Sequence, residues 1–279
     1  MPVHDSGSLA GVHVVTIAPN LPGPLAARHL VQLGASVTKI EAPHGDPAQA
    51  FPQWFQALNA GQIRKTLDLK VPEDREQFFE LLSGADLLLS SMRPSAADRL
   101  SLYEMVARAK VAHIEIVGDV EAPDEPGHDL TYQAAAGLLN PPEMPRVPWA
   151  DVLGGYEATI AALDALRERE HAQKIGNDQA VHRRVGLKQG VDDAAEAFQI
   201  GATAPGQILS GAHPQYGMYQ TQDGWIAVAA IEPHFHATLT ALLGDSRSTL
   251  AERFSKRSTA QWLEFAKQHD LPLAAVEKR

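Results

Sequence analysis

The fold is decided by residues 12–41, VHVVTIAPNLPGPLAARHLVQLGASVTKIE. The stretch begins with a short apolar run rich in β-branched residues, 12–18, which is typical of a buried parallel strand. Residues 25–33 have the apolar spacing of a helix, and Gly34 fits the position just after its last turn. Residues 36–41 (SVTKIE) predict a second strand. A strand, a helix and a second strand in this order form a right-handed βαβ unit, so the segment predicts a parallel sheet.

The same alternation continues through the first half of the chain. We expect further strands at residues 66–69, 86–90 and 111–117. A helix is expected from Pro72 through Leu82, because proline fits the first turn of a helix. Strands that alternate with helices predict an α/β fold with a Rossmann-like parallel sheet.

The second half of the chain changes in character. Residues 151–170 form a long Ala-rich helical pattern, whereas residues 174–206 are polar and weakly patterned. Residues 218–221 and 225–230 then predict a hairpin, and helical segments follow it. The predicted organisation is a large Rossmann-like domain over residues 1–180, a linker over 181–206 and a small α+β domain over 207–279.

The composition is that of an ordinary globular protein, and it excludes several classes of function. Hydrophobic residues make up 44% of the 279 residues, and the absence of cysteine rules out disulfides, thiolate nucleophiles and Cys-ligated metal sites. The formal net charge of −10 argues against nucleic-acid binding, so an anionic ligand would need a local basic patch. We find neither a secretion signal nor an apolar stretch long enough to cross a membrane, and we expect a cytoplasmic protein without membrane contact.

The turn after the first strand argues against a nicotinamide cofactor. A dinucleotide site needs G-x-G-x-x-G at this place, but residues 19–24 are PNLPGP and lack the glycines that let the backbone approach a pyrophosphate. His234 and His236 lie two residues apart and would diverge on a helix, so we expect no metal site there.

One segment, residues 126–133 (PGHDLTYQ), brings three chemically active side chains together. His128, Asp129 and Tyr132 follow a Pro-Gly turn within this short stretch. A histidine at such a place can serve as an acid or base, but it can equally be an ordinary histidine of a turn.

Two further segments carry a single acid in an unusual setting. In residues 147–156 (VPWADVLGGY), Asp151 stands at an expected helix start, where it is either a functional acid or an N-cap. The two glycines that follow cost helix stability, about 1 kcal/mol each, which suggests that another group approaches the backbone closely. In residues 231–235 (IEPHF), Glu232 lies between an apolar strand and Pro233, where it either acts chemically or marks a helix start.

Six segments, taken in order, resemble the family III CoA-transferases, and within them the α-methylacyl-CoA racemase branch. These segments cover most of residues 9–170 and 211–235. They are LAGVHVVTIAPNLPGPLAARHLVQLGASVTKIEAPHGDP, LNAGQIRKTLDLK, LLSGADLLLSSMRPS, PGHDLTYQAAAGLL, ADVLGGYEATIAALDALRERE and GAHPQYGMYQTQDGWIAVAAIEPHF.

The resemblance implies an enzyme that acts on acyl-CoA. The G-H-D-x-x-Y pattern around His128 is similar to that of the racemases, whereas transferases of the family usually carry an aromatic residue at this position. In the racemase interpretation, His128 and Asp151 flank the α-carbon of a 2-methylacyl-CoA and move its proton from one face to the other. Glu232 corresponds to an acid that the partner subunit's small domain supplies to orient the histidine.

Two alternatives stay open beside the racemase. In a CoA-transferase, Asp151 instead attacks the acyl-CoA and forms a mixed anhydride and then an aspartyl-CoA thioester, and His128 has no required role. In a non-catalytic homologue, the chain binds CoA without any reaction. This third alternative is motivated by departures from the family pattern at residues 118–125, 140–146 and 171–190, and by a C-terminal tail that we expect to be missing.

The resemblance also implies a site for CoA and a partner. The phosphates of CoA need cations in a chain of this net charge, and the candidates are Lys39, Arg64, Lys65 and Arg93. Arg64 and Lys65 could equally be solvated surface charges, and Tyr132 joins the CoA site through the racemase pattern. Family members are interlocked homodimers, so we expect a homodimer.

Overall fold

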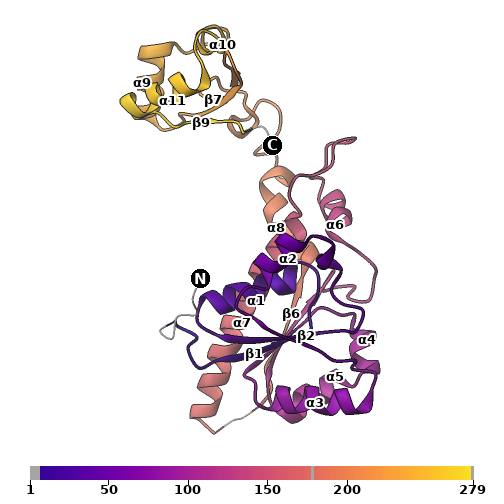
Figure 1. Cartoon of the computed structure of the whole chain (residues 1–279). Helices are drawn as coiled ribbons and strands as arrows, with labels where there is room; N and C mark the ends of the chain where they lie inside the picture. Colours follow the sequence, from indigo (N-terminus) through magenta and orange to yellow (C-terminus); the bar gives the residue numbers. More distant parts are fainter. Residues whose placement is uncertain (1–6, 177–178, 278–279) are drawn as a thin grey trace. The chain divides into compact units, whose positions relative to one another are not determined.

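The computed structural model describes residues 7–176 and 179–277 and divides into two compact units, Met1–Ala195 and Glu196–Arg279 (Figure 1). Each unit has its own hydrophobic core. No helix among the described residues is long and apolar enough to cross a membrane.

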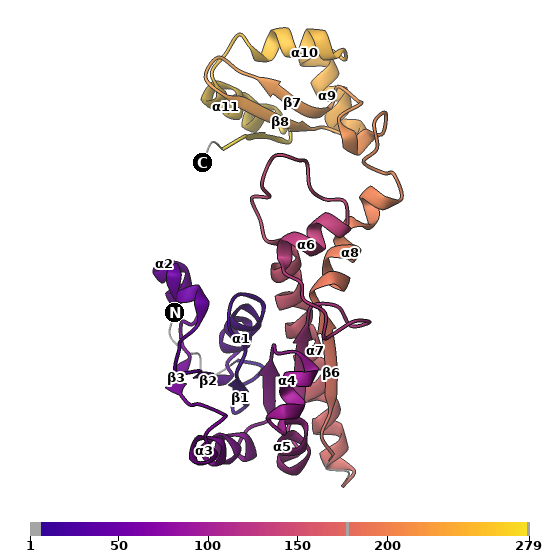
Figure 2. The same ribbon diagram turned by 90° about the vertical axis from the view of Figure 1, so that its right-hand side faces the viewer.

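A six-stranded sheet forms the centre of the first unit (Figure 2). Its strands lie in the order β3-β2-β1-β4-β5-β6, and every neighbouring pair is parallel. This order is that of the Rossmann fold, which confirms the predicted α/β class. The strands are β1 (His13–Thr16), β2 (Ser36–Glu41), β3 (Ile63–Thr66), β4 (Leu87–Ser90), β5 (Ala112–Val117) and β6 (His182–Gly186).

Helices cover both faces of this sheet, as parallel strands require. On one face, α1 (Pro22–Gln32) and α7 (Trp149–Lys174) pack small residues such as Ala162 against β1, β4 and β5. On the other face, α3 (Pro72–Ser83) and α5 (Leu102–Ala109) pack Phe78, Leu82 and Met105 against the sheet. The other helices of the unit are α2 (Pro52–Leu58), α4 (Pro94–Arg99), α6 (Asp129–Ala135), α8 (Leu187–Gln199), which continues into the second unit, and the 3₁₀ turn η1 (Pro47–Ala50).

Two glycines of α7 allow close helix packing, which explains the pair noted in the sequence. A Cβ atom at Gly154 would collide with Leu187 of α8, and one at Gly155 would lie 2.9 Å from Leu25 of α1. The group that approaches the backbone is therefore neighbouring protein. This packing fixes the first turns of α7, where Asp151 lies.

The turn expected at residues 19–24 is shorter in the structure. Helix α1 already begins at Pro22, because proline lacks the N–H that a first turn leaves unpaired and has a backbone φ suited to a helix. The turn is thus confined to residues 17–21, and Asn20 within it adopts a left-handed conformation with φ of 66°.

The linker expected over residues 181–206 is largely folded, and this expectation is wrong for residues 182–199. They form β6 and α8, and the division between the units falls at Ala195. The edge strand β6 is held partly by polar contacts. The fully buried Glu115 of β5 accepts hydrogen bonds from Arg184 Nε, at 2.8 Å, and from the Tyr103 hydroxyl. Because β6 carries arginine and histidine where apolar residues signal a strand, its sequence does not reveal it.

The second unit is a small α+β fold, as predicted. The expected hairpin is present as β7 (Tyr216–Gln220) and β8 (Trp225–Ala229), and the unpredicted β9 (Leu273–Ala275) extends it into an antiparallel sheet of order β7-β8-β9. Helices α9 (Pro233–Leu243), α10 (Arg247–Phe254) and α11 (Thr259–His269) enclose a core with the sheet, and η2 (Ile208–Ser210) precedes it.

Candidate active site

A cavity of about 450 Å³ opens at the carboxyl ends of the central strands of the first unit. The segments that follow β1, β4 and β5 line it, together with residues of η1, α2, α6 and α7. In an open parallel sheet, ligands bind at this edge, where the strand order reverses between β1 and β4. Four of the predicted site residues line this cavity: Arg93, His128, Tyr132 and Asp151.

Asp151 is the third residue of α7, but it does not cap its own helix. The carboxylate of Asp129 does so instead, because its Oδ1 accepts the backbone N–H of Ala150 at 2.8 Å and that of Asp151 at 3.3 Å. The side chain of Asp151 makes no hydrogen bond or salt bridge with any residue that the structure describes. Its carboxyl group is therefore free on the cavity wall.

The surroundings of Asp151 favour its protonated form. Burial is the largest cause, the negative charge of Asp129 adds to it, and His128 opposes both. Together they raise the pKa of Asp151 to about 6. A carboxyl group with a pKa near neutrality can both take and give a proton at physiological pH, which is what an acid–base catalyst needs.

His128 directly precedes α6 and is exposed on the cavity wall. Its backbone N–H donates to the hydroxyl of Thr131, and the same hydroxyl donates back to the His128 carbonyl at 2.8 Å. These two bonds belong to a capping box with Thr131, which holds His128 at the start of α6. The cavity thus brings together an exposed imidazole and an unpaired carboxyl group.

Tyr132 explains the glycines on both sides of the His128 segment. Its side chain is buried, and a Cβ atom at either Gly118 or Gly127 would collide with the Tyr132 hydroxyl. Burial, with the negative charges of Asp119 and Asp151, raises the pKa of Tyr132. Tyr132 therefore stays neutral and fixes the segment that ends at His128.

The cavity contains one exposed arginine, Arg93, among its lining residues. Arg93 lies directly before α4, and its guanidinium makes no hydrogen bond or salt bridge within the described part of the chain. The neighbouring Asp124 accepts the backbone N–H of Ser95 at 3.1 Å, and its pKa is lowered chiefly by Ser95 and further by the charge of Arg93. Arg93 is thus placed to meet an anion in the cavity.

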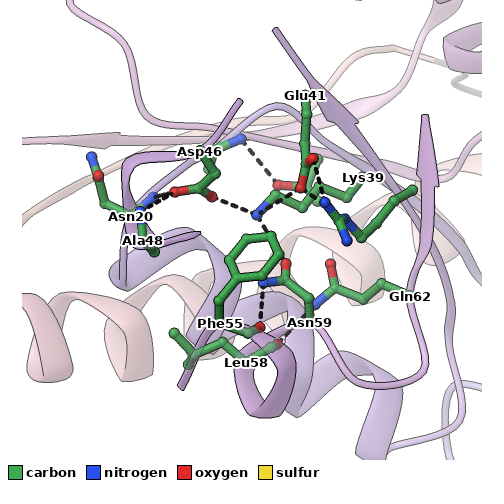
Figure 3. Close-up of polar contacts among 12 residues, drawn as sticks. Asn20, Lys39, Glu41, Asp46, Ala48, Phe55, Leu58, Asn59 and Gln62 are labelled. Atoms are coloured by element: carbon green, nitrogen blue, oxygen red, sulfur yellow. Dashed lines mark hydrogen bonds and ion pairs between the residues drawn. The ribbon is translucent and has the colours of Figure 1, made fainter. Parts of the chain in front are cut away.

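Lys39 is not available to a phosphate, contrary to the sequence prediction (Figure 3). Only 1% of its side chain is exposed, and its ammonium donates to Asp46 Oδ2 at 2.6 Å and to Asn59 Oδ1 at 2.9 Å. Asp46 in turn accepts the backbone N–H groups of Asn20, at 3.0 Å, and of Ala48, at 2.9 Å, and both of these residues line the cavity. Lys39 therefore supports the cavity wall from behind.

Arg64 and Lys65 also lie outside the cavity. Arg64 donates from Nε and Nη2 to the two carboxylate oxygens of Glu41, at 2.9 and 2.7 Å, and its guanidinium lies over the ring of Phe55. This pairing raises the pKa of Arg64. Lys65 is exposed on β3 and forms no hydrogen bond or salt bridge with described residues, which is the arrangement of a surface charge.

The aromatic stretch after η1 divides between core and cavity. Phe55 is buried beside Leu58, whereas Phe51 and Trp54 are 62% and 42% exposed and line the cavity. Of these three aromatic residues, Phe55 thus belongs to the core, and the other two face the cavity.

Glu232 belongs to the second unit and is not among the residues that line the cavity. It is exposed directly before α9, and its side chain caps no N–H of that helix.

Asp129 is the residue whose role the sequence does not reveal. Its place in the G-H-D motif draws attention to it. Its hydrogen bond to the backbone of α7, however, joins segments about twenty positions apart, and no local pattern predicts such a contact.

Comparisons with known proteins give a consistent result. The family model for CoA-transferase family III matches residues 9–279. A CaiB/baiF CoA-transferase family protein of Caenorhabditis elegans is 28% identical over 305 residues, covering 96% of this chain and 85% of the relative. A probable fatty acyl-CoA transferase of Mycobacterium tuberculosis is 25% identical over 303 residues, covering 96% and 77%. The crystal structure of a CAIB/BAIF family protein from Brucella suis has a TM-score of 0.80 at 22% identity, covering 98% of this chain and 84% of that chain, and shows the same fold.

Proposed function

Because the chain belongs to the family III CoA-transferases, as its motifs predict, we propose that it acts on acyl-CoA thioesters. The proposed reaction is racemisation of a 2-methylacyl-CoA by 1,1-proton transfer at the α-carbon. The observation that carries this proposal is that the exposed His128 and the unpaired carboxyl group of Asp151 line one cavity.

Inversion at this carbon requires two groups that exchange a proton. One group removes the α-proton, the electron pair of the broken C–H bond moves into an enolate, and the other group returns a proton to the opposite face. We assign these roles to Asp151 and His128. The pKa of Asp151, about 6, suits both halves of the exchange, because the carboxyl group is a usable base and a usable acid near pH 7.

The CoA moiety needs a cation in a chain of net charge −10. Arg93 is the candidate that the geometry supports, because it lines the cavity and is engaged in no salt bridge with the described residues. We assign Arg93 to the phosphates and Tyr132 to the wall beside them. Coenzyme A is then part of the substrate.

A CoA-transferase is the second candidate. It is favoured by the relatives, since the Mycobacterium tuberculosis protein is described as a probable fatty acyl-CoA transferase. In this reaction an oxygen of Asp151 attacks the thioester carbonyl and the CoA thiolate leaves, which gives a mixed anhydride. That thiolate then attacks the aspartyl carbonyl of the anhydride, the donor acid leaves as its carboxylate, and an aspartyl-CoA thioester remains. The free Asp151 carboxyl group serves this reaction as well, but His128 would have no role in it.

A second copy of the chain is the proposed partner. Helix α7 exposes Tyr156, Ile160 and Leu163, which at spacings of four and three lie on one face of the helix. The Tyr156 ring lies 4.7 Å from that of His29, but all three side chains stay exposed, and such an exposed apolar stripe supports the homodimer that the family resemblance implies. In that dimer, Glu232 of the partner subunit would orient His128.

The racemase proposal is tested by hydrogen exchange at the α-carbon. Purified protein is mixed with a 2-methylacyl-CoA in D2O, and the α-proton signal is followed by NMR. We expect the signal to disappear with wild-type protein and to persist with Asp151→Asn or His128→Gln. Asp223→Asn and His171→Gln, which change the same residue types outside the cavity, should exchange like wild type.

Two other outcomes identify the alternatives. Full exchange with His128→Gln, or no exchange over hours with wild type, contradicts the racemase. A hydroxylamine-trappable adduct on Asp151, formed with a donor thioester, then establishes CoA transfer. Binding of CoA with neither exchange nor adduct establishes the non-catalytic homologue.

A further inference from the structure

The first turn of α7 is capped from another part of the chain. The first N–H groups of a helix have no partner within the helix, and an aspartate in the first turn can turn its own carboxylate toward them. In this protein the N–H groups of Ala150 and Asp151 are already paired with Asp129 Oδ1. The carboxylate of Asp151 therefore finds no free donor there, which is why it can stay unpaired at the cavity.

We propose that Asp129 is a positioning residue for Asp151: by capping α7, it keeps the Asp151 carboxyl group free on the cavity wall and places a fixed negative charge beside it. This inference rests on the proposed role of Asp151 in the reaction. In this proposal Asp129 acts through Asp151 and does not contact the substrate.

Asp129 is itself rigidly held, as such a role requires. Its second oxygen, Oδ2, accepts a hydrogen bond at 2.7 Å from Gln133 Nε2, and the same amide group donates to the Val147 carbonyl at 3.0 Å. Gln133 is only 1% exposed. These hydrogen bonds thus connect α6, the segment before α7 and the first turn of α7 to one another.

The charge of Asp129 acts on Asp151 in a definite direction. The described groups that face Asp151 and can carry charge are Asp129, which raises the pKa of Asp151, His128, which lowers it, and Tyr132, whose own pKa is raised and which stays neutral. The contacts of α7 with α1 and α8 next to Asp151 are apolar, through Leu25 and Leu187. Loss of the Asp129 charge therefore makes Asp151 easier to ionise.

Asp129→Asn removes the charge and keeps an acceptor for the cap, while its NH2 group replaces Oδ2 as the neighbour of Gln133 Nε2. The amide keeps an oxygen that can accept the two N–H groups but removes the negative charge. We expect the titration midpoint of Asp151 to fall by about one pH unit. The direct measurement is the carboxyl ¹³C chemical shift of Asp151 as a function of pH, assigned by its loss in Asp151→Asn, and it requires no substrate. An unchanged midpoint overturns the proposal.

Activity provides the second measurement. Asp151 must be ionised to remove a proton or to attack a thioester, so the acidic limb of kcat/KM in Asp129→Asn should move to lower pH by the same amount. Asp129→Ala, which loses both charge and cap, should lower kcat at least tenfold at every pH while KM changes little. Equal effects of Asn and Ala, with no shift of the acidic limb, would show a merely structural role and overturn the proposal.

Asp223→Asn is the matched control. Asp223 also accepts a first-turn N–H from another segment, that of Thr259 in α11 at 2.7 Å, and it lies outside the cavity. It should leave both the Asp151 midpoint and the pH profile unchanged. If wild-type protein is inactive, the proposed function fails, while the ¹³C titration still decides whether Asp129 controls Asp151.

Discussion

At the scale of single residues, Asp151 shows what an unpaired carboxyl group in a cavity wall costs in stability. It is surrounded by apolar packing and a second carboxylate, and it makes no hydrogen bond with the described residues to compensate. Such a group lowers the free energy of unfolding whenever it is ionised. Active sites frequently contain groups of this kind, which lower stability, and this agrees with the role that we propose for Asp151.

Asp151→Asn should stabilise the protein in a pH-dependent way. The pKa of Asp151 in the folded state, about 6, lies above its ordinary value of 3.8, so the stability present below the ordinary value is lost as pH rises through the folded value. At pH 7.5 we expect the variant to have a free energy of unfolding higher by about 2 kcal/mol, and at pH 4 nearly the wild-type value.

Urea unfolding of both proteins at the two pH values measures this difference. Asp164→Asn provides the control, because Asp164 is an exposed aspartate further along the same helix. A variant no more stable than wild type at pH 7.5 would contradict the assigned environment of Asp151.

The roles of single residues could be predicted from the sequence only where a motif or a local pattern indicates them. The G-H-D-x-x-Y motif and the acid before two glycines led to His128 and Asp151, which do lie in one cavity. Lys39 was assigned wrongly, because a lysine in a strand gives no sign of whether its ammonium reaches solvent or a buried carboxylate. That distinction depends on Asp46 and Asn59, whose positions relative to β2 are set by the fold.

At the scale of elements, the Lys39 pair links β2 to the loop that supports the cavity. Lys39 and Asp46 are both buried, and removal of one partner leaves the other as an unpaired buried charge. Asp46 also fixes the backbone of Asn20 in its left-handed conformation. The carboxylate of Asp46 therefore connects three parts of the fold: the strand β2, the turn that follows β1, and η1.

Lys39→Met should destabilise the first unit strongly. We expect a loss of about 3–5 kcal/mol in the free energy of unfolding, because the Asp46 carboxylate stays buried without its cation. Lys65→Met, on the neighbouring strand but exposed, should cost less than about 0.5 kcal/mol. Chemical denaturation of the three proteins measures both values. Equal stability of Lys39→Met and wild type would refute the buried pair.

Helices and strands with a clear pattern of apolar residues could be predicted from the sequence, and those without one could not. The strands β1, β2, β4 and β5 and the long helix α7 have strong local patterns and were found within a few residues. The strand β3 lies at residues 63–66 instead of 66–69, because all four of its residues are exposed and no alternation marks its ends. The strand β6 was missed because Arg184 and His182 bond to the buried Glu115 of β5, a contact that only the assembled sheet provides.

At the scale of the whole molecule, the apolar stripe of α7 is the surface on which the proposed homodimer depends. The inner face of α7 packs its alanines in the core, while Tyr156, Ile160 and Leu163 on its outer face are 51%, 60% and 38% exposed. A charge placed in the middle of this stripe would have to be desolvated if a second copy covers it. The oligomeric state should therefore respond to substitution of Ile160.

Ile160→Glu should weaken the proposed dimer at least about tenfold, which corresponds to about 1.4 kcal/mol. Sedimentation equilibrium over a range of concentrations measures the dissociation constant. Ile175→Glu makes the same change at another exposed isoleucine, just beyond the last turn of α7, and should leave the constant unchanged. A wild-type protein that stays monomeric, or an Ile160→Glu dimer as tight as wild type, would show that this stripe is not the interface. The proposal that Glu232 of the partner subunit orients His128 would then have no interface to support it.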